Sequence, residues 1–415
     1  MQHDMGLIVQ KFGGTSVGSI EKIKNVADRV IEEAANGNDV VVVVSAMGKT
    51  TDELVSMSYD ITERPSKREM DMLLTTGEQV TIAFLTMALI EKGQEAISLT
   101  GWQAGIKCEA VYGNARILDI DTEKVQNSLN EGKVVVVAGF QGLAEDGGIT
   151  TLGRGGSDTT AVALAAALKA DRCDIYTDVT GVFTTDPRYV KNARKLYSIS
   201  YDEMLELANL GAGVLHPRAV EFAKNHHIPL EVRSSTAQEK GTLIEEEATM
   251  EQNLIVRGIA FEDRITRVTI YGLAGSLGTL STIFTTLAKN QINVDIIIQS
   301  MTEHDMNNLS FSIKSEDVSN LLEVLEANKE MMPFQRVETE TNLAKVSIVG
   351  SGMISNPGVA AEMFAVLAEA KIQIKMVSTS EIKVSTVINE KEMVTAVEAL
   401  HEAFKLDERK PVEVL

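Results

Sequence analysis

The residues of this chain best suited to chemistry lie in its first strand and the loop behind it. The apolar run Leu7-Ile8-Val9 predicts a buried strand, which ends in Lys11, Gly13 and Gly14 before a predicted helix. Glycines let a backbone approach an anion closely, and the first N–H groups of a helix are unpaired. With the mobile charge of Lys11, this stretch predicts a cradle for nucleotide phosphates. An ordinary strand-to-helix turn with a paired lysine is the alternative.

Polar residues also follow three further predicted strands, at the point where each strand ends. Residues 40–44 lead into the loop 45–52, residues 133–140 end among glycines, and residues 173–176 lead into the polar stretch 177–188. Ligands in open α/β sheets bind at the carboxyl ends of the strands. The sequence therefore predicts one ligand site, built from four neighbouring strand ends.

Two stretches resemble nucleotide-binding motifs but lack residues that those motifs need. Gly48-Lys49-Thr50 lacks the glycine that a P-loop needs five residues earlier, where Val43 stands in a predicted strand. Gly350-Ser351-Gly352 resembles the start of a dinucleotide fingerprint, but Ser355 replaces its third glycine and Lys375 stands where an acid is needed. The sequence therefore predicts neither a P-loop nor a nicotinamide site.

A glycine-rich loop in the middle of the chain surrounds a single arginine. Three glycines flank Arg154, and Ser157 and Asp158 follow at the predicted start of a helix. Arginine pairs bidentately with carboxylates or phosphates, and small neighbours let a ligand reach it. This loop predicts an anion contact. The alternative is a surface arginine beside an aspartate that caps a helix.

Glu78 stands out as an acid inside an otherwise apolar predicted helix, residues 67–92. The sequence Thr75-Thr76-Gly77-Glu78 interrupts the helical pattern, and a mid-helix glycine weakens a helix unless the backbone or its neighbour is needed there. The apolar residues around Glu78 favour burial or a cleft over a solvated surface charge.

Composition limits the class of protein. The chain has 415 residues, a net charge of −20 and only 5% aromatic residues, which together predict several domains with helix-covered parallel sheets and no nucleic-acid or anionic-membrane surface. Two cysteines, no signal peptide and no apolar run near ~20 residues predict a soluble cytoplasmic protein. The histidines His216, His226 and His227 have no metal-ligand partners at suitable spacing, so we expect them at turns or helix ends.

The last third of the chain contains an internal repeat. Residues 267–272 match residues 345–350 at a spacing of 78, and the helix and strand that follow match at a spacing of 80. Each copy predicts a small α+β unit of strand, turn, amphipathic helix and strand. Because these units carry no convergent catalytic groups, we expect them to bind or regulate.

Taken together, the motifs resemble those of aspartate kinases. The resemblance rests on Lys11-Phe12-Gly13-Gly14-Thr15-Ser16, the loop 45–52, Thr76-Gly77-Glu78, the loop 153–158 and Tyr176-Thr177-Asp178-Val179. It covers essentially the whole chain and points to the Bacillus-type monofunctional enzymes with tandem ACT domains. It implies an α/β amino-acid-kinase (carbamate-kinase-like) αβα sandwich, followed by two ferredoxin-like α+β ACT domains.

The resemblance also implies a domain organisation. We expect a catalytic domain at residues 5–245, a linker and strand at 246–263, and ACT domains at 264–340 and 341–411. A charged stretch at 245–253 is consistent with a boundary there. Relatives in this group can make the ACT pair as a separate subunit from an internal start, and translation from Met250 would yield such a subunit here.

The activity implied by the resemblance is ATP-dependent phosphorylation of the L-aspartate β-carboxylate to 4-phospho-L-aspartate. This is the first step toward lysine, threonine, methionine and diaminopimelate. Mg²⁺ would be held mainly through the ATP phosphates, with no protein metal site. The residues carried over are, for catalysis, Lys11 and Asp158; for aspartate, Ser45, Thr51, Glu78, Arg154 and Ser157; and for ATP, Lys11, Phe12, Gly13, Gly14, Ser16, Thr177, Asp178, Phe183 and Arg188.

Feedback control is the function implied for the ACT tandem, with lysine as effector, with or without threonine, in a homodimer or α2β2 oligomer. The effector positions carried over are Ser276, Leu277, Gly278, Thr279, Asn293, Val294, Asp295, Gln299, Asn356, Ile374, Ser380 and Glu381. The sequence departs from the family twice: Gly213 replaces a usual lysine, and the loop 274–278 lacks the usual Asp-Lys-Pro-Gly pattern.

Two alternatives remain open from the sequence. The nearer one is another kinase of this fold, acting on glutamate, N-acetylglutamate or a nucleoside monophosphate. The remoter one is a non-catalytic amino-acid sensor, which Gly213 would favour.

Overall fold

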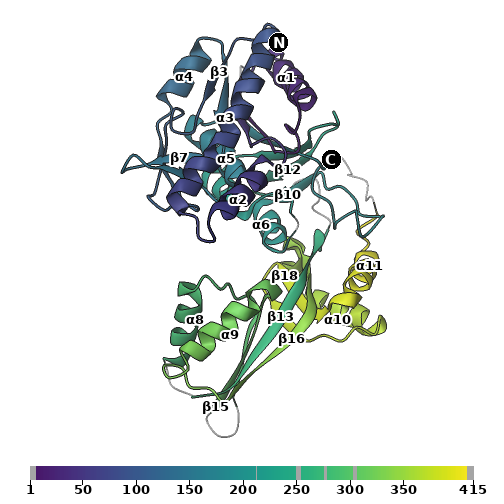
Figure 1. Cartoon of the computed structure of the whole chain (residues 1–415). Helices are drawn as coiled ribbons and strands as arrows, with labels where there is room; N and C mark the ends of the chain where they lie inside the picture. The colour runs from purple at the N-terminus through teal and green to yellow at the C-terminus, as the bar shows by residue number, and fades with distance from the viewer. Residues whose placement is uncertain (1–5, 212, 249–253, 275–277, 302–305, 409–415) are drawn as a thin grey trace. The chain divides into compact units, whose positions relative to one another are not determined.

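A computed structural model describes the chain except for residues 1–5, 212, 249–253, 275–277, 302–305 and 409–415 (Figure 1). The chain forms two compact units, which we describe separately. The first unit holds most of the chain up to residue 248. The second runs from residue 254 and also includes Thr184–Arg194, which the sequence assigned to the catalytic domain. The exact domain boundaries remain predictions.

An eight-stranded sheet forms the centre of the first unit, in the order β10-β12-β11-β9-β1-β2-β6-β3. All neighbouring strands are parallel except β11 and β12. Unbroken runs of β-branched residues build its middle, because a strand covered on both faces has no polar side. The strands are β1 (Leu7–Phe12), β2 (Asp39–Val44), β3 (Ala96–Leu99), β6 (Val134–Ala138), β9 (Arg172–Thr177), β10 (Ser198–Ser200), β11 (Leu230–Ser234) and β12 (Thr242–Glu245).

Helices cover both faces of this sheet. The core on one face joins α1 and α3 to Phe12 and to alternate valines of β2 and β6. Lys11 points to the opposite face, because neighbouring residues of a strand alternate, and there it meets α5. The predicted αβα sandwich is therefore confirmed. The helices are α1 (Ile20–Ala35), α2 (Thr50–Ile61), α3 (Lys67–Glu91), α4 (Glu123–Asn130), α5 (Gly156–Leu168), α6 (Tyr201–Asn209) and α7 (Pro217–His226).

One helix, α3, is long and apolar enough to cross a membrane by length and composition alone. The expectation that no apolar stretch approaches that length is therefore wrong for this helix. Its most apolar window has a mean hydropathy of 1.5 and is 44% buried. Because α3 packs against α1 and β6 and buries Asp71 and Glu78, it is a core helix of the folded unit.

A second, four-stranded sheet in the first unit was not expected from the sequence. Its order is β5-β4-β7-β8, from β4 (Ile106–Cys108), β5 (Ile117–Ile120), β7 (Gln141–Ala144) and β8 (Ile149–Thr151). Asp71 of α3 fastens it: its carboxylate accepts hydrogen bonds from Thr151 N at 2.9 Å, Thr151 Oγ1 at 2.8 Å and Gly113 N at 2.9 Å. This small sheet fixes the start of the loop that carries Arg154.

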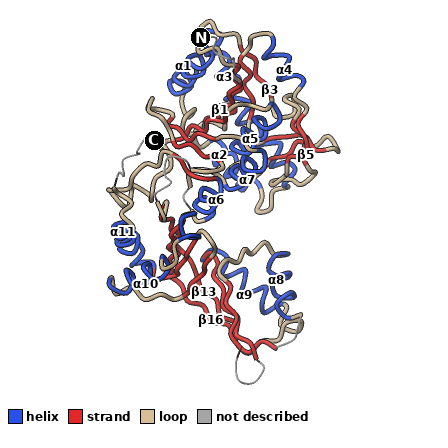
Figure 2. Tube along the Cα trace, turned by 180° about the vertical axis from the view of Figure 1, so that it is seen from behind, coloured by secondary structure: helices blue, strands red, loops and turns tan. Residues whose placement is uncertain are grey.

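The second unit is a six-stranded antiparallel sheet in the order β14-β15-β13-β16-β18-β17. Its two halves have separate cores, each with two helices, so the predicted repeat is present as two α+β units (Figure 2). The strands are β13 (Gly258–Ala274), β14 (Ile297–Met301), β15 (Met306–Lys314), β16 (Arg336–Val349), β17 (Met376–Thr379) and β18 (Lys383–Asn389). The helices are α8 (Thr279–Lys289), α9 (Val318–Ala327), α10 (Val359–Glu369) and α11 (Met393–Ala403), with 3₁₀ turns Ser315–Asp317, Ser351–Ser355 and Glu390–Glu392.

Candidate active site

The carboxyl ends of β9, β1, β2 and β6 lie side by side, since these four parallel strands are neighbours in the sheet. Backbone hydrogen bonds continue between the loops that follow them. Ser45 N donates to Phe12 O at 3.2 Å, and Gly13 N donates to Tyr176 O at 3.4 Å. The structure thus brings the predicted loops 11–16, 45–51 and 177–178 to one edge of the sheet.

Lys11 and Asp158 form an ion pair at this edge, with 2.6 Å between Lys11 Nζ and Asp158 Oδ1. Each side chain is only 12% exposed. Asp158 sits in the first turn of α5, where the helix dipole favours a negative charge. The Asp158 carboxylate holds the Lys11 side chain at the edge of the loop. Because the Lys11 ammonium is already largely removed from solvent there, little further desolvation is needed when it contacts an anion.

The loop after β1 packs closely against the loop after β2. Gly48 N donates to Gly14 O at 3.0 Å, and Ser16 N donates to Gly13 O at 2.9 Å. Ser16 is buried, and its hydroxyl has no hydrogen-bond partner among the described residues. A buried hydroxyl without a partner beside Gly13 and Gly14 is consistent with a site that a ligand completes.

Glu78 is buried beneath these loops, with a residue exposure of 2%. One carboxylate oxygen accepts a hydrogen bond from Ala46 N at 3.1 Å, and the other has no partner among the described residues. Burial raises the pKa of Glu78 to about 7. The helix α3 runs unbroken through Glu78, so the predicted interruption is not there. Gly77 instead allows close approach, because a Cβ on it would lie 2.7 Å from Ala46 Cβ.

The pKa of Glu78 predicts a pH dependence of aspartate binding. If its carboxylate pairs with the substrate ammonium, only the ionised form binds, and that form is lost as the pH falls through about 7. We expect the KM for aspartate to rise roughly fivefold from pH 7 to pH 6. In Glu78→Gln this rise should disappear, with a higher KM already at pH 8. Initial rates across pH 6–9 check this, and an equal rise in the variant would contradict it.

Arg154 stands on an exposed turn between Gly153 and Gly155. Gly155 has φ +67° and lies so close to His216 that a Cβ would be 2.1 Å from its ring, so only glycine fits there. The Arg154 side chain makes no ion pair with any residue that the structure describes. Its loop follows β8, which Asp71 anchors. Asp71 lies two turns from Glu78 on the same face of α3, so the loop and Glu78 share one side of that helix.

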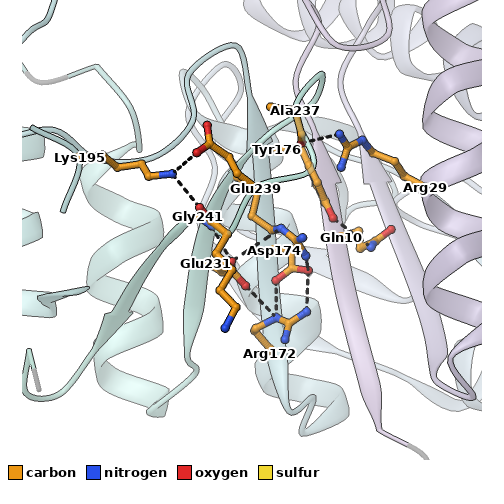
Figure 3. A network of polar contacts seen from close by, with 12 residues as sticks. Gln10, Arg29, Arg172, Asp174, Tyr176, Lys195, Glu231, Ala237, Glu239 and Gly241 are labelled. Carbon is orange, nitrogen blue, oxygen red and sulfur yellow. Dashed lines mark hydrogen bonds and ion pairs between the residues drawn. The ribbon is translucent and has the colours of Figure 1, made fainter. Parts of the chain in front are cut away.

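Sequence reasoning missed a polar network behind the end of β9 (Figure 3). Tyr176 stacks on Phe12 with 4.4 Å between ring centroids, and the guanidinium groups of Arg29 and Arg233 lie 5.5 and 5.6 Å from its ring. Burial raises the pKa of Tyr176 to about 12, so its ring stays neutral. The stack joins the strand of Lys11 to the strand that leads into Thr177.

Asp174 is the buried acid of the same network. It is fully buried and pairs with Arg172 Nε at 2.5 Å and Arg233 Nη1 at 3.5 Å. Glu231 of β11 lies 3.7 Å from Arg172 Nε. The available signal was the polar residues Gln10 and Asp174 inside otherwise apolar strands, which a core strand does not need.

The remaining predicted site residues lie as follows. Ser45 and Thr51 are half-buried in the loop and first turn after β2, and Ser157 is buried beside Asp158. Thr177 donates to Asp178 Oδ1 at 3.1 Å. Arg188 pairs with Asp186 at 2.6 Å, within the segment Thr184–Arg194 of the second unit. The histidines lie at the two ends of α7, as expected.

The predicted effector positions lie in loops and at edges of the second unit. Asp295 pairs with Lys345 at 2.5 Å, and Glu262 pairs with the same lysine at 3.0 Å. Within one chain the set is divided, because Gln299 is in edge strand β14 and Ser380 and Glu381 are in the turn before β18, toward the other edge. Ser276 and Leu277 lie outside the described residues; the others are Gly278 and Thr279 at the start of α8, Asn293 and Val294 after it, Asn356 before α10 and Ile374 before β17.

Comparison with known proteins identifies the family. The model of the amino acid kinase family matches residues 6–234, and an ACT domain model matches residues 268–328 and 346–404. An aspartokinase from Bacillus sp. (strain MGA3) is 76% identical over 97% of this chain and 98% of its own length. The chain belongs to the aspartokinase family. Aspartokinase 2 of Bacillus subtilis (strain 168) is 73% identical over the same shares.

Solved structures agree with this assignment. The crystal structure of E. coli aspartokinase III in complex with aspartate and ADP matches with a TM-score of 0.79 and 28% identity, over 96% of this chain and 99% of that chain. The lysine and aspartate complex of the same enzyme matches with a TM-score of 0.76 over the same shares. The family and fold expected from the sequence are therefore confirmed.

Proposed function

We propose that this aspartokinase transfers the γ-phosphoryl group of ATP to the β-carboxylate of L-aspartate, giving 4-phospho-L-aspartate. We place this reaction at the entry to lysine, threonine, methionine and diaminopimelate synthesis, in the cytoplasm. The observation that carries the proposal is the Lys11–Asp158 pair, held at 2.6 Å where the parallel strands end. The full-length identity to aspartokinases supports it.

The chemistry needs positioning and charge stabilisation rather than a base. The attacking β-carboxylate has an ordinary pKa near ~4 and is already ionised at neutral pH. Its approach to a triphosphate is opposed by like charges, and Lys11 offsets this repulsion at the transferring phosphoryl group. Arg154 would pair with the α-carboxylate and Glu78 with the ammonium, which aims the β-carboxylate at the phosphorus. Ser45, Thr51 and Ser157 complete the aspartate contacts in this proposal.

ATP would lie along the ends of β1 and β9. Lys11, Phe12, Gly13, Gly14 and Ser16 would hold its phosphates, and Thr177, Asp178, Phe183 and Arg188 belong to the nucleotide stretch. Among the residues that the structure describes, no group of three His, Cys, Asp or Glu side chains is placed to hold a metal. We propose that Mg²⁺ is carried mainly by the triphosphate, where it would supply charge neutralisation.

A substrate panel tests the proposal against its alternatives. ADP release is measured with ATP, Mg²⁺ and either aspartate, glutamate, N-acetylglutamate or UMP. We expect turnover with aspartate at least about a hundredfold above the others, because a misplaced carboxylate leaves buried polar groups unpaired. Equal or greater turnover with another acceptor would favour a different kinase of this fold. ATP binding without turnover of any acceptor would favour a sensor.

Lysine, with or without threonine, is the effector that we propose for the ACT pair. The lysine complex of E. coli aspartokinase III supports this choice. Effector binding would shift a two-state equilibrium of the kinase unit, and pairing of chains as a homodimer or α2β2 oligomer would bring the divided effector positions together. We expect lysine to lower activity and to raise the melting temperature, because it binds the folded state. No change in either quantity with lysine and threonine together would contradict this proposal.

A further inference from the structure

The segment Thr184–Arg194 is built into the core of the second compact unit. Val190, only 6% exposed, is a member of the core of the second ACT repeat together with Ile259. Its neighbour Tyr189 makes an edge-to-face contact with Phe261, with 5.0 Å between ring centroids. A segment inside the amino acid kinase match, residues 6–234, thus packs into the core of the second unit.

Hydrogen bonds inside the second unit join the two ends of this segment, Thr184 and Arg194, which we call its base. Thr184 N donates to Arg194 O at 2.8 Å, and Arg194 N donates to Thr184 Oγ1 at 2.9 Å. Thr184 O accepts from Ile259 N at 2.7 Å, and Thr184 Oγ1 lies 2.9 Å from Nε2 of His401 in α11. Thr184 and His401 are both buried. The base is therefore tied to both a strand and a helix of the second repeat.

The chain on either side of the segment is tied just as firmly inside the first unit. Val182 N donates to Thr242 Oγ1 at 2.9 Å, Leu196 N donates to Val182 O at 2.8 Å, and Thr242 Oγ1 donates to Leu196 O at 2.6 Å. Only Phe183 separates the anchored Val182 from the anchored Thr184. Phe183 itself forms an antiparallel bridge with Lys195. Because successive Cα atoms are ~3.8 Å apart, this single residue cannot absorb a shift of several ångströms.

We propose that Thr184–Arg194, which carries Arg188 of the proposed ATP set, is a strap through which the second ACT repeat positions the nucleotide-binding stretch 177–183. Val190 and Thr184 are its positioning residues. The inference rests on the proposed function for the role of residues 177–183. A rearrangement of the second repeat that moves Thr184 would also move Val182, because only Phe183 lies between them. The core of the first repeat, as far as the structure describes it, includes no residue of this segment.

If the strap acts on the nucleotide stretch, its variants should change the affinity for ATP and leave the KM for aspartate unchanged. Val190→Ala removes two buried methyl groups from the strap, and Val324→Ala makes the same change in the first repeat, at 7% exposure. We expect Val190→Ala to raise the KM and Kd for ATP at least about fivefold, the lower end of typical coupling between sites. The KM for aspartate and kcat should change by less than about twofold, and Val324→Ala should leave ATP affinity unchanged.

Thr184→Val is the second variant, because it removes the hydroxyl that meets His401 and keeps the side-chain volume. It should weaken ATP binding as Val190→Ala does. If Val190→Ala does not fold, the proposal is tested with Thr184→Val alone. The full chain is used throughout, with thermal melting to show that each variant is folded. Calorimetric titration with ATP tests the strap independently of the proposed aspartate kinase activity, since ATP affinity is measured without aspartate turnover. Folded Val190→Ala and Thr184→Val proteins with wild-type ATP affinity, or an equal loss in Val324→Ala, would overturn the strap.

Discussion

Replacing Lys11 by methionine should lower kcat about a thousandfold and leave the KM for aspartate within about threefold. The reason is that negative charge on the transferring phosphoryl group is redistributed in the transition state, where the Lys11 ammonium is already held in place by Asp158 at 2.6 Å. A buried donor that acts on developing charge contributes about 3–4 kcal/mol to catalysis. Steady-state rates at saturating aspartate and ATP measure this.

Two control variants make the Lys11 result interpretable. Lys11→Met leaves the Asp158 carboxylate without its partner, which itself destabilises a fold. The double variant Lys11→Met with Asp158→Asn removes both charges and should recover the melting temperature without recovering kcat. Lys49→Ala, in the Gly-Lys-Thr loop that only resembles a P-loop, should keep kcat within about twofold. Loss of activity in Lys49→Ala with retention in Lys11→Met would reverse the assignment of the phosphate-contacting lysine.

Arg154→Ala should raise the KM for aspartate about a hundredfold while the KM for ATP stays unchanged. The Arg154 side chain is exposed on its turn and makes no ion pair with the described residues, so a bound α-carboxylate would be its first strong partner. A bidentate charge-assisted pair contributes roughly 2–3 kcal/mol. Saturation curves for aspartate at fixed ATP give the value.

The conservative variant and a matched arginine sharpen this prediction. Arg154→Lys keeps the charge and loses the bidentate geometry, so its KM should lie between those of the wild type and Arg154→Ala. Arg116→Ala removes another exposed arginine of the same unit and should leave the KM for aspartate within about twofold. An unchanged aspartate KM in Arg154→Ala, or a rise in the KM for ATP instead, would contradict the role given to Arg154.

The positions of these groups were largely predictable because parallel strands impose them. Strand runs such as residues 40–44 are apolar throughout, and parallel neighbours bring their carboxyl ends to one edge whatever the loops contain. The burial of Glu78 was also expected from its apolar neighbours. Its pKa was not, because burial in three dimensions raises that pKa and no sequence pattern reports it.

Other features could not be predicted for physical reasons. The strands of the small sheet have only three or four residues, too few for an alternating pattern to be recognised. The stack of Tyr176 on Phe12 joins residues that are far apart in the chain. Thr184–Arg194 has the composition of an ordinary loop, and only its packing shows that Val190 belongs to another unit's core.

The central claim is that aspartate itself receives the phosphoryl group, and trapping the acyl phosphate tests it most directly. Enzyme, ATP, Mg²⁺ and aspartate are incubated with hydroxylamine, and the hydroxamate is identified by mass spectrometry. We predict β-aspartyl hydroxamate, formed in proportion to ADP and abolished in Lys11→Met. ADP release without hydroxamate, or a hydroxamate that forms equally without ATP, would contradict the claim.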